Sequence, residues 1–154
     1  MTDLSIQREI VIDAPADVVW RTITEPAQIE RWFFDRVELD VQPGGRGTFA
    51  FKGRETGEPV TVAIVVETVD APRRFAFRWG RPTSGTPEPA GSILVDFTLS
   101  PEGAERTRLR VVETGLDTVG WPEEEKSRYA DDHRRGWEEK LGALAALFGP
   151  SRDE

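Results

Sequence analysis

Residues 122–148 read PEEEKSRYADDHRRGWEEKLGALAALF, and this stretch decides the fold. Its stripe of large side chains recurs every three or four residues, as on one face of an α-helix. The stripe residues are Tyr129, His133, Trp137, Leu141, Leu144 and Phe148. Glutamates after Pro122 suit the positive end of a helix dipole, and Gly149-Pro150 is a usual stop signal. The pattern predicts one helix of about 27 residues with a single apolar stripe.

Upstream of this helix the apolar period changes to two, which is typical of strands with one buried face. We expect strands at about 5–13, 34–41, 46–52, 59–70, 73–79, 92–100 and 106–114. The later strands are joined by short, turn-rich links, which favours antiparallel pairing because parallel pairing needs long crossovers. After the first strand, Pro15 can open a short helix to about residue 24, and Pro26 a second one through Trp32.

These elements predict an α+β helix-grip fold. A curved antiparallel sheet of six to seven strands wraps around the long C-terminal helix, because each strand offers one apolar face and the helix offers one stripe. The 154 residues need no second domain, so we expect a single domain over 1–154 with its core at about 5–149. The segment 80–91, GRPTSGTPEPAG, is rich in turn residues and is predicted to be a mobile hairpin loop.

Composition excludes several classes of chemistry and partner. The absence of cysteine excludes disulfides, thiolate nucleophiles and Cys-type zinc sites. A formal charge of −8 argues against nucleic acid as a partner, because phosphate backbones bind clustered Lys and Arg. No apolar run approaches the ~20 residues of a membrane span. The first residues show no secretory signal, so we expect a cytoplasmic protein without a membrane span.

Four stretches, in this order along the chain, carry a resemblance to a known family. They are EIVIDAPADVVWRTIT at 9–24, AQIERWF at 27–33, VQPGGRGTF at 41–49 and HRRGWEEKLGALAALF at 133–148. The chain resembles the SRPBCC (START-like, Bet v 1-like) superfamily, in the branch similar to the C-terminal domain of the Hsp90 ATPase activator. The resemblance implies the order strand, two helices, six strands and long helix, with a cavity between the sheet and the final helix.

The superfamily includes lipid and hormone carriers, polyketide cyclases and members of undefined role. The leading prediction is therefore binding of an apolar or aromatic small molecule in that cavity. One alternative is an Hsp90-type co-chaperone or interaction domain, with a chaperone as partner and a role in the stress response. A second alternative is a cyclase- or dehydratase-like enzyme. No cofactor is indicated, and the run Asp131-Asp132-His133 does not predict a metal site because adjacent helix positions point in different directions.

Nine apolar side chains are candidates for lining the cavity, since small-molecule sites are mostly apolar. They are Trp32, Phe33, Phe49, Phe51, Phe77, Trp79, Phe97, Trp137 and Leu141. Each is also compatible with a filled core. Gly136, next to Trp137, is predicted to let the helix approach a strand closely.

His133 and Glu113 are the two candidates for acid–base chemistry. His133, the only histidine, could project from the helix stripe into the cavity. The sequence favours a simpler interpretation, in which it closes the stripe or bonds a sheet carbonyl. Glu113 shares its parity with Leu109 and Val111, which could place a carboxylate at the inner end of the last strand, beside His133. The alternative, favoured at this level, is an exposed strand end.

Overall fold

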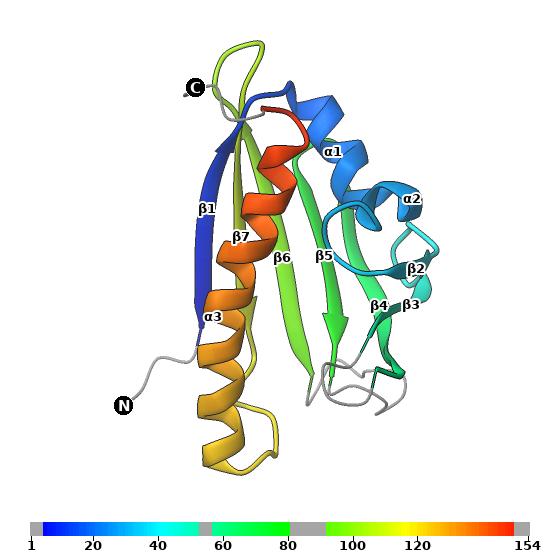
Figure 1. Ribbon diagram of the computed structural model, residues 1–154, viewed down its shortest axis with the longest axis vertical. Helices are drawn as coiled ribbons and strands as arrows, with labels where there is room; N and C mark the ends of the chain where they lie inside the picture. The colour runs from blue at the N-terminus through cyan, green and yellow to red at the C-terminus, as the bar shows by residue number, and fades with distance from the viewer. Residues whose placement is uncertain (1–4, 53–56, 81–91, 150–154) are drawn as a thin grey trace.

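The fold is the predicted one, a long helix held against the inner face of a curved sheet (Figure 1). The computed structural model describes residues 5–52, 57–80 and 92–149. Its elements are β1 (Ile6–Ile12), α1 (Ala16–Thr24), α2 (Pro26–Ile29), β2 (Arg36–Leu39), β3 (Arg46–Lys52), β4 (Pro59–Asp70), β5 (Arg74–Trp79), β6 (Ile93–Pro101), β7 (Thr107–Thr114) and α3 (Glu123–Ala146). The loop predicted at 80–91 lies, from residue 81 onward, outside the described residues. The single-domain organisation stays a prediction.

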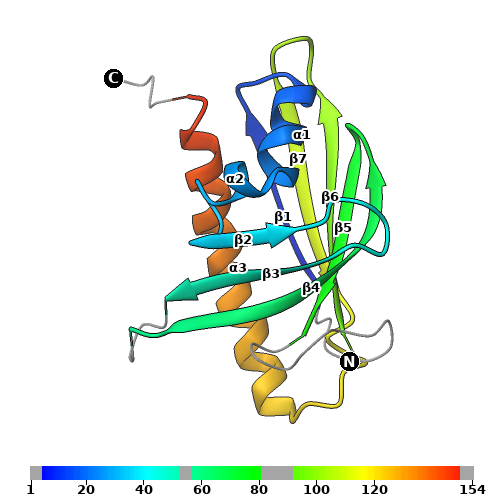
Figure 2. The ribbon, with the colours of Figure 1, turned by 90° about the vertical axis from the view of Figure 1, so that its right-hand side faces the viewer.

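Seven strands form one antiparallel sheet in the order β1-β7-β6-β5-β4-β3-β2. Only β1 departs from chain order, and it pairs with β7 so that Ile6 lies opposite Glu113. The register of β4 on β5 shifts between Val66 and Thr68, and such bulges bend a strand and increase its twist. The sheet curves so strongly that β2 and β3 run across the direction of β1 and β7 (Figure 2).

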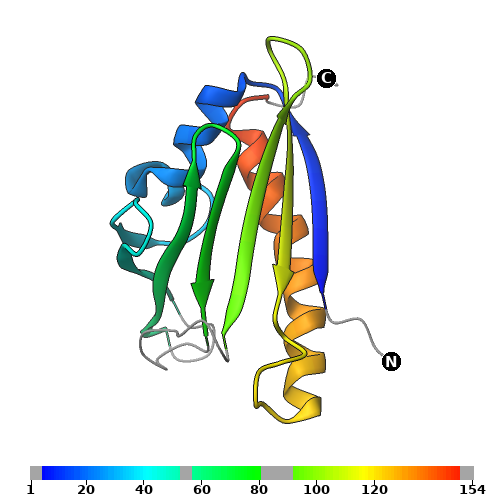
Figure 3. The same cartoon turned by 180° about the vertical axis from the view of Figure 1, so that it is seen from behind.

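Helices α1, α2 and α3 lie on the concave side, and the view from behind shows β4 to β7 in front of them (Figure 3). The inner face of the sheet is aromatic, and Phe75, Phe77 and Phe97 are at most 1% exposed. Phe75 meets Trp20 of α1 with ring centroids 6.2 Å apart, and Phe97 meets Trp137 of α3 at 5.7 Å. Burial of such side chains stabilises the fold by roughly 1.5–3 kcal/mol each.

No helix in the described part of the chain is long and apolar enough to span a membrane.

Two substitutions on α3 are expected to change the free energy of unfolding in opposite directions. Leu144 is fully buried, so Leu144→Ala is expected to lower the free energy of unfolding by about 2–5 kcal/mol. Gly142 is exposed in the interior of α3, and no neighbouring atom would meet a Cβ there. Gly142→Ala is therefore expected to raise the free energy of unfolding by about 0.5–1 kcal/mol. Urea unfolding measures both, and a neutral Leu144→Ala would contradict the packing of α3 on the sheet.

Candidate functional site

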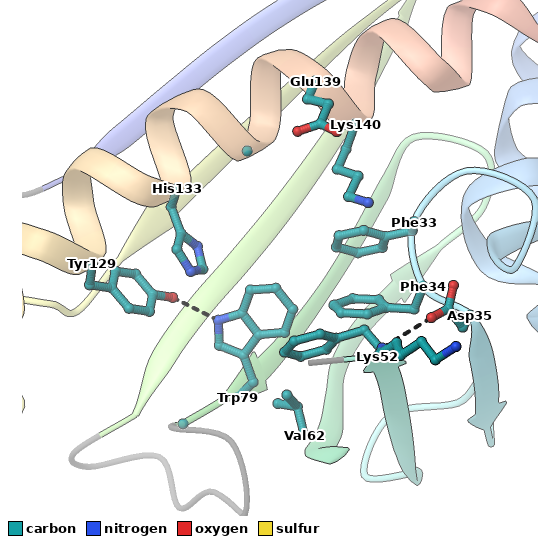
Figure 4. Close-up of a pocket in the computed structure, with 13 residues that line it drawn as sticks. Phe33, Phe34, Asp35, Lys52, Val62, Trp79, Tyr129, His133, Glu139 and Lys140 are labelled. Atoms are coloured by element: carbon teal, nitrogen blue, oxygen red, sulfur yellow. Dashed lines mark hydrogen bonds between the residues drawn. The ribbon is translucent and has the colours of Figure 1, made fainter. Parts of the chain in front are cut away.

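A cleft of about 560 Å³ opens between α3 and the strands β3 to β5, beside the segment that follows α2 (Figure 4). Its apolar walls are largely aromatic, and charged side chains stand at its mouth. The lining residues are Phe33, Phe34, Asp35, Phe51, Lys52, Val62, Trp79, Gly80, Tyr129, His133, Gly136, Glu139 and Lys140. An overlapping hollow extends to Asp132, Arg135 and Trp137. The site is thus an apolar cleft with a few polar groups, which is the usual composition of a small-molecule site.

Gly136 is one reason why this part of the interior is open. No described atom lies within 4 Å of the place where its Cβ would stand, apart from its chain neighbours and its own helix backbone. The predicted close approach of helix and strand at this glycine is therefore wrong. Large side chains stand at the neighbouring stripe positions of α3, but Gly136 has none. The space that a side chain would fill at this position therefore stays open over the cleft.

The buried carboxylate of Glu113 joins β7 to α3 next to the cleft. It is only 2% exposed, which contradicts the exposed strand end favoured from the sequence. Its Oε1 accepts a hydrogen bond from Nε1 of Trp137 at 2.6 Å and lies 2.8 Å from Nδ1 of His133. Its Oε2 accepts the hydroxyl of Tyr129 at 2.5 Å. The three partners stand four residues apart on α3, so one helix face supplies all of them.

Tyr129 connects this carboxylate to the sheet a second time. Its hydroxyl oxygen accepts a hydrogen bond from Nε1 of Trp79 at 2.9 Å. Its ring stacks on the imidazole of His133, with centroids 3.7 Å apart and an angle of 17° between the planes. Burial of the hydroxyl, followed by the charge and hydrogen bond of Glu113, raises the pKa of Tyr129 well above 10.0.

The structure divides the nine predicted cavity residues between the cleft and the core. Phe33, Phe51 and Trp79 line the cleft, and Trp137 borders the overlapping hollow. The remaining five are buried in the core, namely Trp32, Phe49, Phe77, Phe97 and Leu141. Aromatic neighbours pack against several of them: Phe49 and Phe77 have ring centroids 5.5 Å apart, and Phe97 lies 6.4 Å from Trp32 and 5.7 Å from Trp137.

Several lining residues were not predicted from the sequence. Tyr129 carried a usable signal, since it lies one helical turn before His133 on the same stripe. Lys52 and Lys140 carried none, because lysines at a strand end or on a helix are ordinarily exposed to solvent. The acidic pair beside His133 is engaged elsewhere, with Asp131 bonded to Arg134 at 3.2 Å and Asp132 to Arg135 at 2.8 Å. Residues 5–52, 57–80 and 92–149 contain no cluster of three or more potential metal ligands.

A sheet that grips one long helix, with an aromatic cleft between them, defines a helix-grip protein of the SRPBCC type. The chain belongs to the Activator of Hsp90 ATPase homolog 1-like protein family, whose sequence profile matches residues 13–149. The predicted resemblance is confirmed.

Solved structures share the fold. Protein MLL2253 from Mesorhizobium loti is 22% identical, with 93% of this chain and 95% of that chain covered and a TM-score of 0.72. CalU16 from Micromonospora echinospora is 27% identical, with coverages of 95% and 76% and a TM-score of 0.66. DynU16, a protein in the dynemicin biosynthetic locus, is 26% identical with a TM-score of 0.73, and 95% of this chain matches 48% of that longer one. A search of curated proteins finds no match.

Tyr129 is the only tyrosine, so its ionisation can be followed directly. Because its folded-state pKa lies above the unfolded value of 10.0, its stabilising contribution is complete below pH 10 and is lost as the pH rises through the folded pKa. We expect tyrosinate absorbance to appear together with the loss of tertiary circular dichroism during an alkaline titration. Ionisation near pH 10 in protein that remains folded would contradict the buried contact with Glu113.

Proposed function

We propose that the chain binds a small aromatic or apolar molecule in the cleft between α3 and the sheet. The observation that carries the proposal is a cleft of about 560 Å³ with aromatic walls and a fixed imidazole at its side. Ligand pockets range from about 300 to 1,000 Å³ and combine apolar walls with a few placed polar groups. The membership of DynU16 in a biosynthetic locus also supports a small-molecule ligand.

The wall rings meet at different angles, which suits a flat ligand. Phe33 and Trp79 are tilted at 47° with centroids 6.2 Å apart, and Phe34 and Trp79 stand at 89° and 6.2 Å. Phe34 and Phe51 are tilted at 41° and lie 5.9 Å apart. Aromatic pairs favour offset-stacked and edge-to-face contacts, so an incoming ring can meet faces on one side and edges on another.

A larger side chain on α3 that fills the cleft tests the proposal. Gly136→Leu places a side chain in the open space of the cleft, whereas Gly142→Leu adds the same side chain at an exposed position further along α3. We expect methoxynaphthalene, a two-ring probe, to bind the unchanged protein and Gly142→Leu equally. Gly136→Leu should weaken binding at least about tenfold, since it occupies the same volume. Ligand-observed NMR titration measures the three dissociation constants.

Two results would contradict this function. The first is the absence of measurable binding of two-ring aromatics to the unchanged protein. The second is equal binding to both leucine variants, which would place the probe elsewhere on the surface. Thermal unfolding of both variants is the control for folding, because each removes a glycine from a helix interior and is expected to keep or raise the melting temperature.

The contact between His133 and Glu113 favours acid–base chemistry as a second candidate function. A carboxylate 2.8 Å from Nδ1 orients an imidazole as a general base requires, and the imidazole borders the cleft. A cyclase- or dehydratase-like reaction on a bound polyketide-like substrate would use this group. Unchanged turnover after His133→Ala would remove the candidate.

The co-chaperone alternative rests on family membership, and an absence of ATPase stimulation would count against it. The cytoplasmic location stays a prediction.

A further inference from the structure

Two of the hydrogen bonds at Glu113 have a fixed direction, with the carboxylate as the acceptor. The indole of Trp79 can only donate, so the hydroxyl oxygen of Tyr129 accepts from it, and the one hydroxyl proton of Tyr129 goes to Oε2 of Glu113. The indole of Trp137 likewise donates to Oε1. A carboxylate that accepts hydrogen bonds at both oxygens is satisfied in its ionised form, which has no proton to give.

This direction fixes the tautomer of His133. Its Nδ1 lies 2.8 Å from Oε1 of Glu113, and an ionised carboxylate only accepts, so Nδ1 carries the hydrogen. In the neutral imidazole, Nε2 is then a bare hydrogen-bond acceptor. Glu113 is a positioning residue in this arrangement, because it acts on a ligand only through the imidazole.

The remaining nitrogen is available to the cleft. One ring carbon separates Nε2 from Nδ1, and the hydrogen-bonding directions of the two nitrogens diverge widely in the ring plane. Because Nδ1 is turned toward the buried carboxylate, Nε2 is directed away from it. His133 lines the cleft, its side chain is 29% exposed, and Nε2 forms no hydrogen bond with the described residues. Figure 4 shows the imidazole between Tyr129 and Trp79, on the side of the cleft opposite Phe33 and Phe34.

We propose that His133 Nε2 is the polar recognition point of the cleft and selects aromatic ligands that carry a hydroxyl donor, such as phenols and naphthols. The inference rests on the proposed function, because it assumes an aromatic ring between the walls. A hydroxyl on that ring donates to Nε2, and the carboxylate of Glu113 behind the imidazole strengthens Nε2 as an acceptor. Two carboxylates also line the cleft, but Asp35 and Glu139 are exposed residues, so water competes for their oxygens. The hydroxyl of Tyr129 is already engaged, because it accepts from Trp79 and donates to Glu113.

The test compares naphthol with methoxynaphthalene at neutral pH. The two probes share their rings, but the ether has no proton to donate. We expect naphthol to bind the unchanged protein about tenfold more tightly, since a hydrogen bond to a partly buried acceptor is worth about that factor. His133→Asn should remove the preference while methoxynaphthalene still binds. The asparagine amide nitrogen can replace Nδ1 as the donor to Glu113, whereas its carbonyl oxygen takes the place of Cδ2 and does not reach the position of Nε2.

A second measurement does not depend on any ligand. His133 is the only histidine, so its two ring nitrogens give one pair of ¹⁵N signals. In the neutral ring we expect Nδ1 protonated and Nε2 bare, and Glu113→Gln should weaken that tautomer preference because a neutral amide replaces the carboxylate. This readout separates a positioning role from a merely structural one.

The outcomes distinguish the inference from the proposed function. Equal binding of the two probes, a naphthol preference that survives His133→Asn, or protonation of Nε2 in place of Nδ1 would each overturn the inference. In all three cases Gly136→Leu can still block methoxynaphthalene, and the proposed function then stands. Failure of both probes to bind the unchanged protein would overturn the two together.

Discussion

The buried carboxylate of Glu113 is the contact on which the relation between sheet and helix depends. Removing a carboxylate from water is costly unless its lone pairs are satisfied, and here donors from Tyr129, His133 and Trp137 satisfy them. These donors are spaced one turn apart along α3. A shift of the helix by one residue would withdraw them together, so the carboxylate fixes the register of α3 on β7 as apolar contacts alone would not.

The same register places the cleft. With Trp137 held against β7, Gly136 and the imidazole of His133 line the cleft together with residues of β3, β4 and β5. The polar groups beside the cleft, His133 and Glu113, therefore belong to a helix and a strand whose positions are fixed by burial. Sites built on regular elements hold their geometry more tightly than sites on loops.

Period and turn chemistry were enough to predict all seven strands, the three helices and the layer arrangement, because each element has one buried side that its own residues reveal. The same information could not separate cleft from core. Phe49 and Phe51 stand on the same face of β3, yet Phe49 is packed under aromatic neighbours and Phe51 borders the cleft. Strand parity identifies the inner face, but which part of that face stays uncovered depends on where the helices cross it.

Glu113 shows the same limit for a polar residue. Its parity indicated the inner face, but a carboxylate near a strand end is usually solvated, and only the position of α3 decides otherwise. The donors that decide it come from residues 129–137, on an element that follows β7 in the chain. A single sequence does not directly show which side chains of two such elements will be in contact.

The pairing of β1 with β7 has a consequence for synthesis of the chain. Ile6 and Glu113 lie opposite each other although about 100 residues separate them. The edge strand β1 therefore cannot pair with β7 until most of these residues have been synthesised. Loop-closure entropy for such a contact is lost before the contact stabilises anything, which slows folding of antiparallel sheets relative to helical bundles. On the ribosome, the cleft can take shape only after α3, which forms one of its walls, has left the exit tunnel.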